Sequence, residues 1–157
     1  MTRLHTDDPK TSTLEEHCSF YASVYHLPTT IDPYSKQIVM RVGGVAGAVT
    51  MPVRIGREVL AALRIRMLAG PVVEHPQGLR WTFITGPSHW IGDGARADLT
   101  RAGASIANPG NIVVLPTFDE RVGGDWRWVR RPAASWDFPP QSAVISTVRA
   151  LTVRSMV

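Results

Sequence analysis

Several common features are missing from this sequence, and each absence removes a class of protein. The 157 residues include one cysteine, Cys18, so neither an intrachain disulfide nor a zinc-finger pattern can form. No apolar run approaches the roughly 18 residues that a membrane-spanning helix needs. Residues 1–10 are polar and show no signal-peptide pattern. These absences together predict a cytoplasmic protein.

Lysine is also scarce, although the chain is basic. Of the 17 basic residues only Lys10 and Lys36 are lysines, and the formal net charge is +4. Arginine makes planar, bidentate contacts with phosphate. The same bias also arises from codon usage in high-GC bacteria, and most dedicated nucleic-acid binders have a stronger or more clustered basic signature. The composition therefore permits a nucleic-acid partner without requiring one.

The hydrophobic fraction of 44% and the charged fraction of 19% are typical of one folded domain. We expect a flexible polar arm over residues 1–11 and a single domain over 12–157. Helical patterns predict helices over 14–25, 52–68, 93–102 and 141–153. Strands are expected over 37–42, 45–51, 72–74, 79–85, 105–107, 111–115 and 126–130. Gly43-Gly44 favours a hairpin between the first two strands, and the order predicts an α+β fold, mainly an antiparallel sheet with helices packed on it.

No complete catalytic or metal-binding pattern is present. The five histidines lack the spacing that places two imidazoles on one helical face, and the thirteen carboxylates are dispersed along the chain. We therefore predict no catalytic residue, no metal site and no cofactor. One alternative is an enzyme with an unrecognised site near Glu74, His75 and His89, with Asp93, provided that these groups converge. Taken alone, His75 reads as a solvated histidine in a turn.

Two basic segments are candidates for nucleic-acid binding. On the predicted helix over 52–68, Arg54, Arg57 and Arg64 fall within about 80° of one another. The simpler interpretation of this stripe is a solvated helix face.

The second basic segment is a predicted strand. Alternation places Trp126, Trp128 and Arg130 on one face and Arg127, Val129 and Arg131 on the other. Rings next to arginines can stack on bases and bind phosphates, although a tryptophan core with arginines at its rim is the simpler interpretation. The nucleic-acid candidates of this segment are Arg127, Arg130 and Arg131.

A third segment is a candidate for protein binding. The proline-rich stretch over 132–140 includes Trp136 and Phe138, which could anchor a partner if they are exposed. A protein-interaction or homodimerisation module with no nucleic-acid role is therefore a further alternative.

The second half of the chain resembles a known family. The sequence includes Gly78-Leu79-Arg80-Trp81-Thr82-Phe83, then residues 104–116 with Asn111-Ile112-Val113-Val114-Leu115-Pro116, then Gly124-Asp125-Trp126-Arg127-Trp128. This ordered series is similar to the N-terminal domain of bifunctional DNA primase/polymerases, the archaeo-eukaryotic primase type. The resemblance implies a primase-polymerase-like scaffold, related to the RNA-recognition-motif fold, over about residues 45–130.

The family's catalytic residues are not found at the matching positions. Its Asp-x-Asp strand corresponds to Ala48-Val49-Thr50-Met51, its histidine to Arg80 or Trp81, and its third aspartate to Ser105. Nucleotidyl transfer by two metal ions requires such carboxylates. The resemblance therefore implies a non-enzymatic accessory or binding protein that contacts nucleic acid or a replication or transcription protein. If the kinship holds, Val49, Met51, Trp81 and Ser105 meet in one cleft.

Overall fold

The computed structural model describes residues 13–117, 125–133 and 138–155. Within these residues four α-helices and eight strands follow one another, and the strands form two sheets in which all pairs are antiparallel. The predicted α+β class is confirmed. The predicted N-terminal arm lies outside the described residues.

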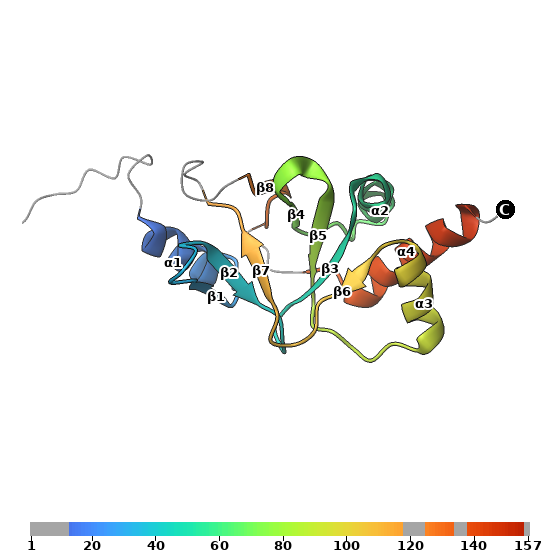
Figure 1. Ribbon diagram of the computed structural model, residues 1–157, viewed down its shortest axis with the longest axis horizontal. Helices are drawn as coiled ribbons and strands as arrows, with labels where there is room; N and C mark the ends of the chain where they lie inside the picture. The colour runs from blue at the N-terminus through green and yellow to red at the C-terminus, as the bar shows by residue number, and fades with distance from the viewer. Residues whose placement is uncertain (1–12, 118–124, 134–137, 156–157) are drawn as a thin grey trace, which may run out of the picture.

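The larger sheet has five strands and occupies the middle of the molecule (Figure 1). Its strands, in spatial order, are β6 (Ser105–Ile106), β3 (Gly47–Pro52), β5 (Arg80–Thr85), β4 (Val72–Glu74) and β8 (Arg127–Arg130). Strands β4 and β5 form a hairpin through the 3-10 turn η1 (Pro76–Gly78). In that turn Gln77 has a φ of 72° and Gly78 a φ of 68°, which explains the glycine because a Cβ disfavours this left-handed region.

The smaller sheet consists of β1 (Thr29–Ile31), β2 (Ile38–Arg41) and β7 (Ile112–Leu115), with β2 in the middle. The predicted hairpin between the strands on either side of Gly43-Gly44 is wrong, since β2 and β3 belong to different sheets. A tight turn does form there, because the Gly43 N–H donates to the Ala46 carbonyl at 3.0 Å. However, β5 and β6 occupy both edges of β3, so β2 pairs with β7 instead.

The helices divide between the two sides of the larger sheet (Figure 1). Helix α1 (Leu14–Val24) lies beside the smaller sheet, and its N-cap Thr13 accepts a hydrogen bond from the Glu16 N–H at 3.2 Å. Helices α2 (Val53–Ile65), α3 (Asp93–Arg101) and α4 (Gln141–Ser155) lie on the opposite side. Helix α2 ends three residues earlier than predicted, and Met67 beyond it adopts a left-handed φ of 57°.

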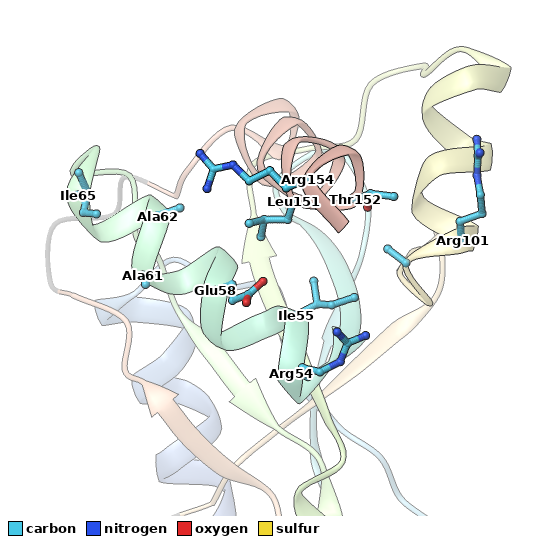
Figure 2. Close-up of a pocket in the computed structure, with 11 residues that line it drawn as sticks. Arg54, Ile55, Glu58, Ala61, Ala62, Ile65, Arg101, Leu151, Thr152 and Arg154 are labelled. Atoms are coloured by element: carbon cyan, nitrogen blue, oxygen red, sulfur yellow. The ribbon is translucent and has the colours of Figure 1, made fainter. Parts of the chain in front are cut away.

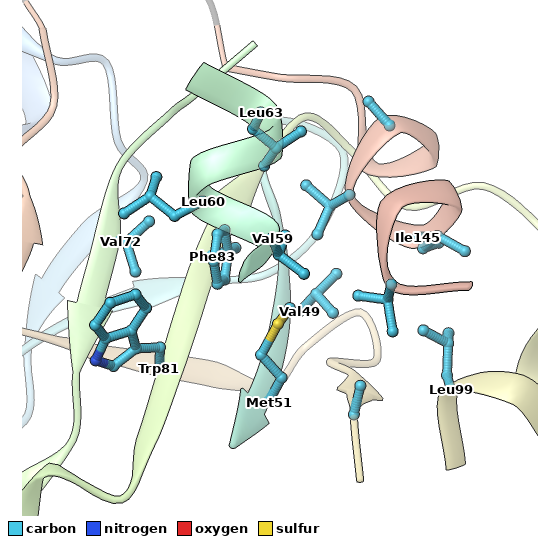
Figure 3. Packing of buried hydrophobic residues seen from close by; sticks show 14 residues of the cluster. Val49, Met51, Val59, Leu60, Leu63, Val72, Trp81, Phe83, Leu99 and Ile145 are labelled. Carbon is cyan, nitrogen blue, oxygen red and sulfur yellow. The ribbon is translucent and has the colours of Figure 1, made fainter. Parts of the chain in front are cut away.

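Two hydrophobic cores lie on the two faces of the larger sheet. The first core, between this sheet and the helices α2 and α4, includes Val49, Met51, Trp81 and Phe83 (Figure 3). The second core, between the same sheet, the smaller sheet and α1, includes Ala48 and Ile84. Successive residues of a strand point to opposite faces, so β3 and β5 each contribute to both cores.

Candidate functional site

A groove lies on the outer surface of the helical side, between α2, α4 and the end of α3 (Figure 2). Its volume is about 620 Å³. Three arginines from three different helices line it, namely Arg54, Arg101 and Arg154, together with one carboxylate, Glu58. The rest of the lining is mostly aliphatic: Ile55, Ala61, Ala62, Ile65, Ala102, Leu151 and Thr152.

The positive charge of the chain is concentrated on these helices. Helices α2 to α4, with the C-cap Arg66, carry eight arginines against three carboxylates, a net charge of +5 that exceeds the +4 of the whole chain. Asp98 pairs with two of them, Arg101 at 2.7 Å and Arg149 at 2.9 Å. Within the described residues Arg54 and Arg154 have no ion-pair partner, so their guanidinium groups are available to a ligand.

The six arginines predicted from the sequence do not form one surface. Arg54 lines the groove, while Arg57 and Arg64 are exposed further around α2. Arg127 and Arg130 belong to the edge strand β8, and Arg131 follows it. The residues that sequence reasoning missed are Arg101 and Arg154, because they come from helices whose packing against α2 no local pattern reveals.

Two tryptophans, Trp128 in β8 and Trp126 just before it, belong to the second core rather than to a base-stacking surface. Trp126 and Trp128 both pack against that core, and Val129 packs against the first core on the opposite face. The Trp128 Nε1–H donates to the Tyr21 hydroxyl at 3.0 Å, and the Tyr21 hydroxyl donates to the Pro116 carbonyl at 2.6 Å. The simpler interpretation of this strand, core tryptophans with arginines at the edge, describes the structure.

A second hollow, the cleft, lies where the two sheets diverge, and its volume is about 560 Å³. Thr50, Thr82 and His75 line it from β3, β5 and the end of β4. His75 Nε2 lies 2.6 Å from Thr82 Oγ1, which lies 2.7 Å from Thr50 Oγ1. The other lining residues are Ser105, Ile106, Ala107, Asn111, Ile112, Val113, Val114 and Trp126. The structure therefore brings three hydrogen-bonded polar side chains to a concave surface.

His75 is not the solvated turn histidine that the sequence predicted. Its ring is half-buried, packs against Trp126 with ring centroids 4.6 Å apart, and contacts Thr82. Burial lowers the pKa of His75, and the positive charge of Arg80 lowers it further. The imidazole is therefore neutral at neutral pH.

The four residues expected to meet in one cleft do not do so. Val49, Met51 and Trp81 are buried in the first core, under the helices, whereas Ser105 is exposed on the edge strand β6. The reason is the alternation of the strands, since the residues that face the cleft are the next ones along, Thr50 and Thr82. Each of these threonines has apolar neighbours on both sides in its strand, and this was the signal that could have identified them.

The other acid and histidine candidates are dispersed. The Glu74 carboxylate accepts a hydrogen bond from Trp81 Nε1 at 3.2 Å on the face opposite the cleft. His89 lines a separate hollow of about 230 Å³ beside Arg96, and Asp93 begins α3. Among the described residues, no group of three or more His, Cys, Asp or Glu side chains is placed to hold a metal ion. Glu74, His75 and His89 therefore do not form one site.

The proline-rich segment differs from its predicted exposure. Trp136 lies outside the described residues. Phe138 is half-buried and packs against the second core, and Pro132 and Pro139 on either side of it are buried. Phe138 therefore stabilises the fold rather than presenting an exposed anchor for a partner.

Comparisons with known families, with curated proteins and with solved structures find no match to this chain. The primase-polymerase resemblance therefore stays a prediction from the sequence. In the part of the chain that the structure describes, no helix combines the length and the apolar character needed to cross a bilayer.

Proposed function

We propose that this protein binds nucleic acid as an accessory factor, through phosphate contacts in the groove between α2, α3 and α4. The observation that carries the proposal is the convergence of Arg54, Arg101 and Arg154 on one groove. Guanidinium groups match phosphate oxygens in a bidentate geometry. The net charge of +5 on the three helices and the C-cap Arg66 adds a longer-range attraction for a polyanion.

The composition of the groove favours contacts with the backbone rather than with bases. Of the groove-lining residues in the described part of the chain, none has an aromatic or amide side chain, and these are the usual partners for stacking and for reading base edges. We therefore expect binding with little sequence preference. An accessory role also fits β3, which has Ala48, Val49, Thr50 and Met51 where a polymerase strand would need carboxylates to bind Mg²⁺.

The test is a salt titration of binding by the full chain. Fluorescence anisotropy with a labelled 30-nucleotide single strand and a 30-base-pair duplex measures the affinity at several salt concentrations. Phosphate contacts release counterions, so the logarithm of the association constant falls linearly with the logarithm of the salt concentration. Binding that is undetectable at low salt, or that does not respond to salt, overturns the proposal.

An acidic amphipathic segment of a partner protein is the second candidate ligand, because the floor of the groove is apolar. Ile65 lines the groove with 84% of its surface exposed, and Met67, just beyond α2, is 92% exposed. An amphipathic helix can place apolar residues on such a floor and acidic residues against the arginines.

The neutral substitution Ile65→Ser distinguishes the two ligands. We expect it to weaken the binding of an acidic amphipathic peptide and to leave nucleic-acid affinity unchanged, since it removes no charge. The protein partner would be favoured by two results together. Ile65→Ser would lose affinity for the peptide, and the nucleic-acid affinity would be the same in wild type and variant and would not respond to salt. Equal affinity of the wild type and the variant for the peptide removes this second candidate.

A further inference from the structure

The cleft and the groove lie on opposite sides of the larger sheet. The cleft contains a series of hydrogen bonds in which the arginines of the groove take no part. Thr50 on β3 and Thr82 on β5 are partners in the antiparallel register, so their side chains lie side by side on one face. Thr82 is also paired with Val73 on β4, which places His75, two residues later, on the same face. The order of contacts is His75, Thr82, Thr50, with distances of 2.6 and 2.7 Å.

The donors and acceptors of these three side chains limit how protons can be arranged along the series of hydrogen bonds. A hydroxyl has one proton to donate and lone pairs that accept. With His75 neutral and its proton on Nδ1, Nε2 accepts from Thr82, and Thr82 then accepts from Thr50. This arrangement leaves the lone pairs of Thr50 Oγ1 toward the cleft. Thr82 is 2% exposed, so it is buried between the other two and can pass a proton without meeting the ligand.

The surroundings favour an uncharged ligand with a carbonyl group. Among the described residues that line the cleft, His75 is the one titratable side chain, and Arg80 is the charged group that acts on the imidazole. Ile106, Ile112 and Val114 provide apolar walls for an acyl chain. The Ser105 hydroxyl and the Asn111 amide line the same cleft and can donate hydrogen bonds to an oxyanion.

We propose that the cleft is an acyl-transfer site, in which Thr50 is the nucleophile and His75 is its general base acting through Thr82. The substrate class is an uncharged activated acyl compound, an ester or a thioester. This activity is separate from nucleic-acid binding and does not rest on it, since the cleft and the groove lie on opposite faces of the sheet.

The proposed reaction has two steps. Thr50 Oγ1 attacks the acyl carbonyl while its proton passes to Thr82 and the Thr82 proton passes to His75 Nε2. The bond from the acyl carbon to the leaving alcohol or thiol breaks. Thr50 is now an ester and cannot relay a proton, so the leaving group takes a proton from solvent water in the cleft while His75 releases its proton to solvent. Water then attacks the Thr50 ester, releasing the carboxylic acid and restoring the threonine, so no oxidant, reductant or cofactor is required.

The test uses p-nitrophenyl butyrate and the full chain. We expect release of p-nitrophenol and, in intact-protein and peptide mass spectra of quenched samples, a butyryl adduct on Thr50. Thr50→Val removes the adduct and Thr50→Ser retains it. Thr30→Val, an exposed threonine on a strand of the other sheet, is the matched control and leaves labelling unchanged.

Two further variants separate a relay from a merely structural role. Thr82→Val and His75→Gln each lower the rate of acylation by about 100-fold, the usual order for loss of a general base. In the wild type this rate rises with pH as His75 loses its proton, and His75→Gln removes that rise. Circular dichroism confirms that each variant is folded. Labelling of Thr50→Val equal to that of the wild type, or unchanged rates in the folded Thr82→Val and His75→Gln variants, overturns the proposal.

Discussion

The two faces of the five-stranded sheet are built from the same strands but differ in what covers them. Toward α2 and α4 the sheet is covered by one continuous apolar core, and the arginines lie outside the helices (Figures 2 and 3). Toward the smaller sheet the core occupies one end only, and the other end is the polar cleft with Thr50 and Thr82. Neighbouring residues of β3 therefore lie in different surroundings: Val49 lies in the first core, and Thr50, the next residue, lines the cleft. Chemistry on a sheet therefore depends on which face a residue occupies, not on its strand alone.

The largest effect is expected where the helical side is most closely packed. Phe83 is 1% exposed and belongs to the first core. Phe83→Ala should lower the free energy of unfolding by about 3–5 kcal/mol, because it removes apolar contacts and leaves a cavity. Urea denaturation measures this change. Ile112→Ala, at a position that is 53% exposed beside the cleft, is the control; an equal loss there would remove the distinction between the two faces.

A smaller effect is expected at the polar contact that joins α1 to the second core. Tyr21→Phe leaves the Trp128 Nε1–H and the Pro116 carbonyl without their partner in this contact. The free energy of unfolding should fall by about 1–3 kcal/mol, the usual penalty for buried polar groups that lose a hydrogen bond. Denaturation of wild type and variant under the same conditions tests this. No loss of stability would show that water satisfies both groups and that this end of the second core is open.

The smallest effect is a dependence of stability on pH that arises in the cleft. Burial and the charge of Arg80 lower the pKa of His75 in the folded state. As pH falls below about 6.5, the unfolded state takes up a proton that the folded state resists, so stability decreases. The slope of unfolding free energy against pH in this acidic range should be shallower in His75→Gln. An unchanged slope would show that the imidazole is as well solvated as in the unfolded chain.

The positions of the elements could be predicted to a large extent because their signals are local. The helix after Pro52, the hairpin of β4 and β5 and the closing helix all lie where turn residues and periodicity indicate. Strand β1 was missed, because its three residues follow Pro28 and adjoin a turn. The division into two sheets was missed because Gly43-Gly44 specifies a turn and not the strand that pairs beyond it.

The candidate site was predicted less well, and the reason is physical. Strands β3 and β5 are buried on both faces, so they lack the polar and apolar alternation that would assign each residue to a face. Val49 and Met51 were expected in the cleft because the family resemblance matched them to its Asp-x-Asp strand, and no alternation in β3 assigned Thr50 to that face instead. Arg54 was found from its helix, but Arg101 and Arg154 join it only through the packing of three helices.

The measurement that tests the central claim most directly compares two triple variants that remove the same charge from different places. One variant replaces Arg54, Arg101 and Arg154 in the groove with alanine, and the other replaces Arg127, Arg130 and Arg131 at β8. For duplex DNA the groove variant should reduce the salt slope of the logarithmic association constant by about 2.7, the value for three lost phosphate contacts. The β8 variant should keep the slope of the wild type. A groove variant with an unchanged slope, or a β8 variant with the same loss, would contradict the assignment of binding to the groove.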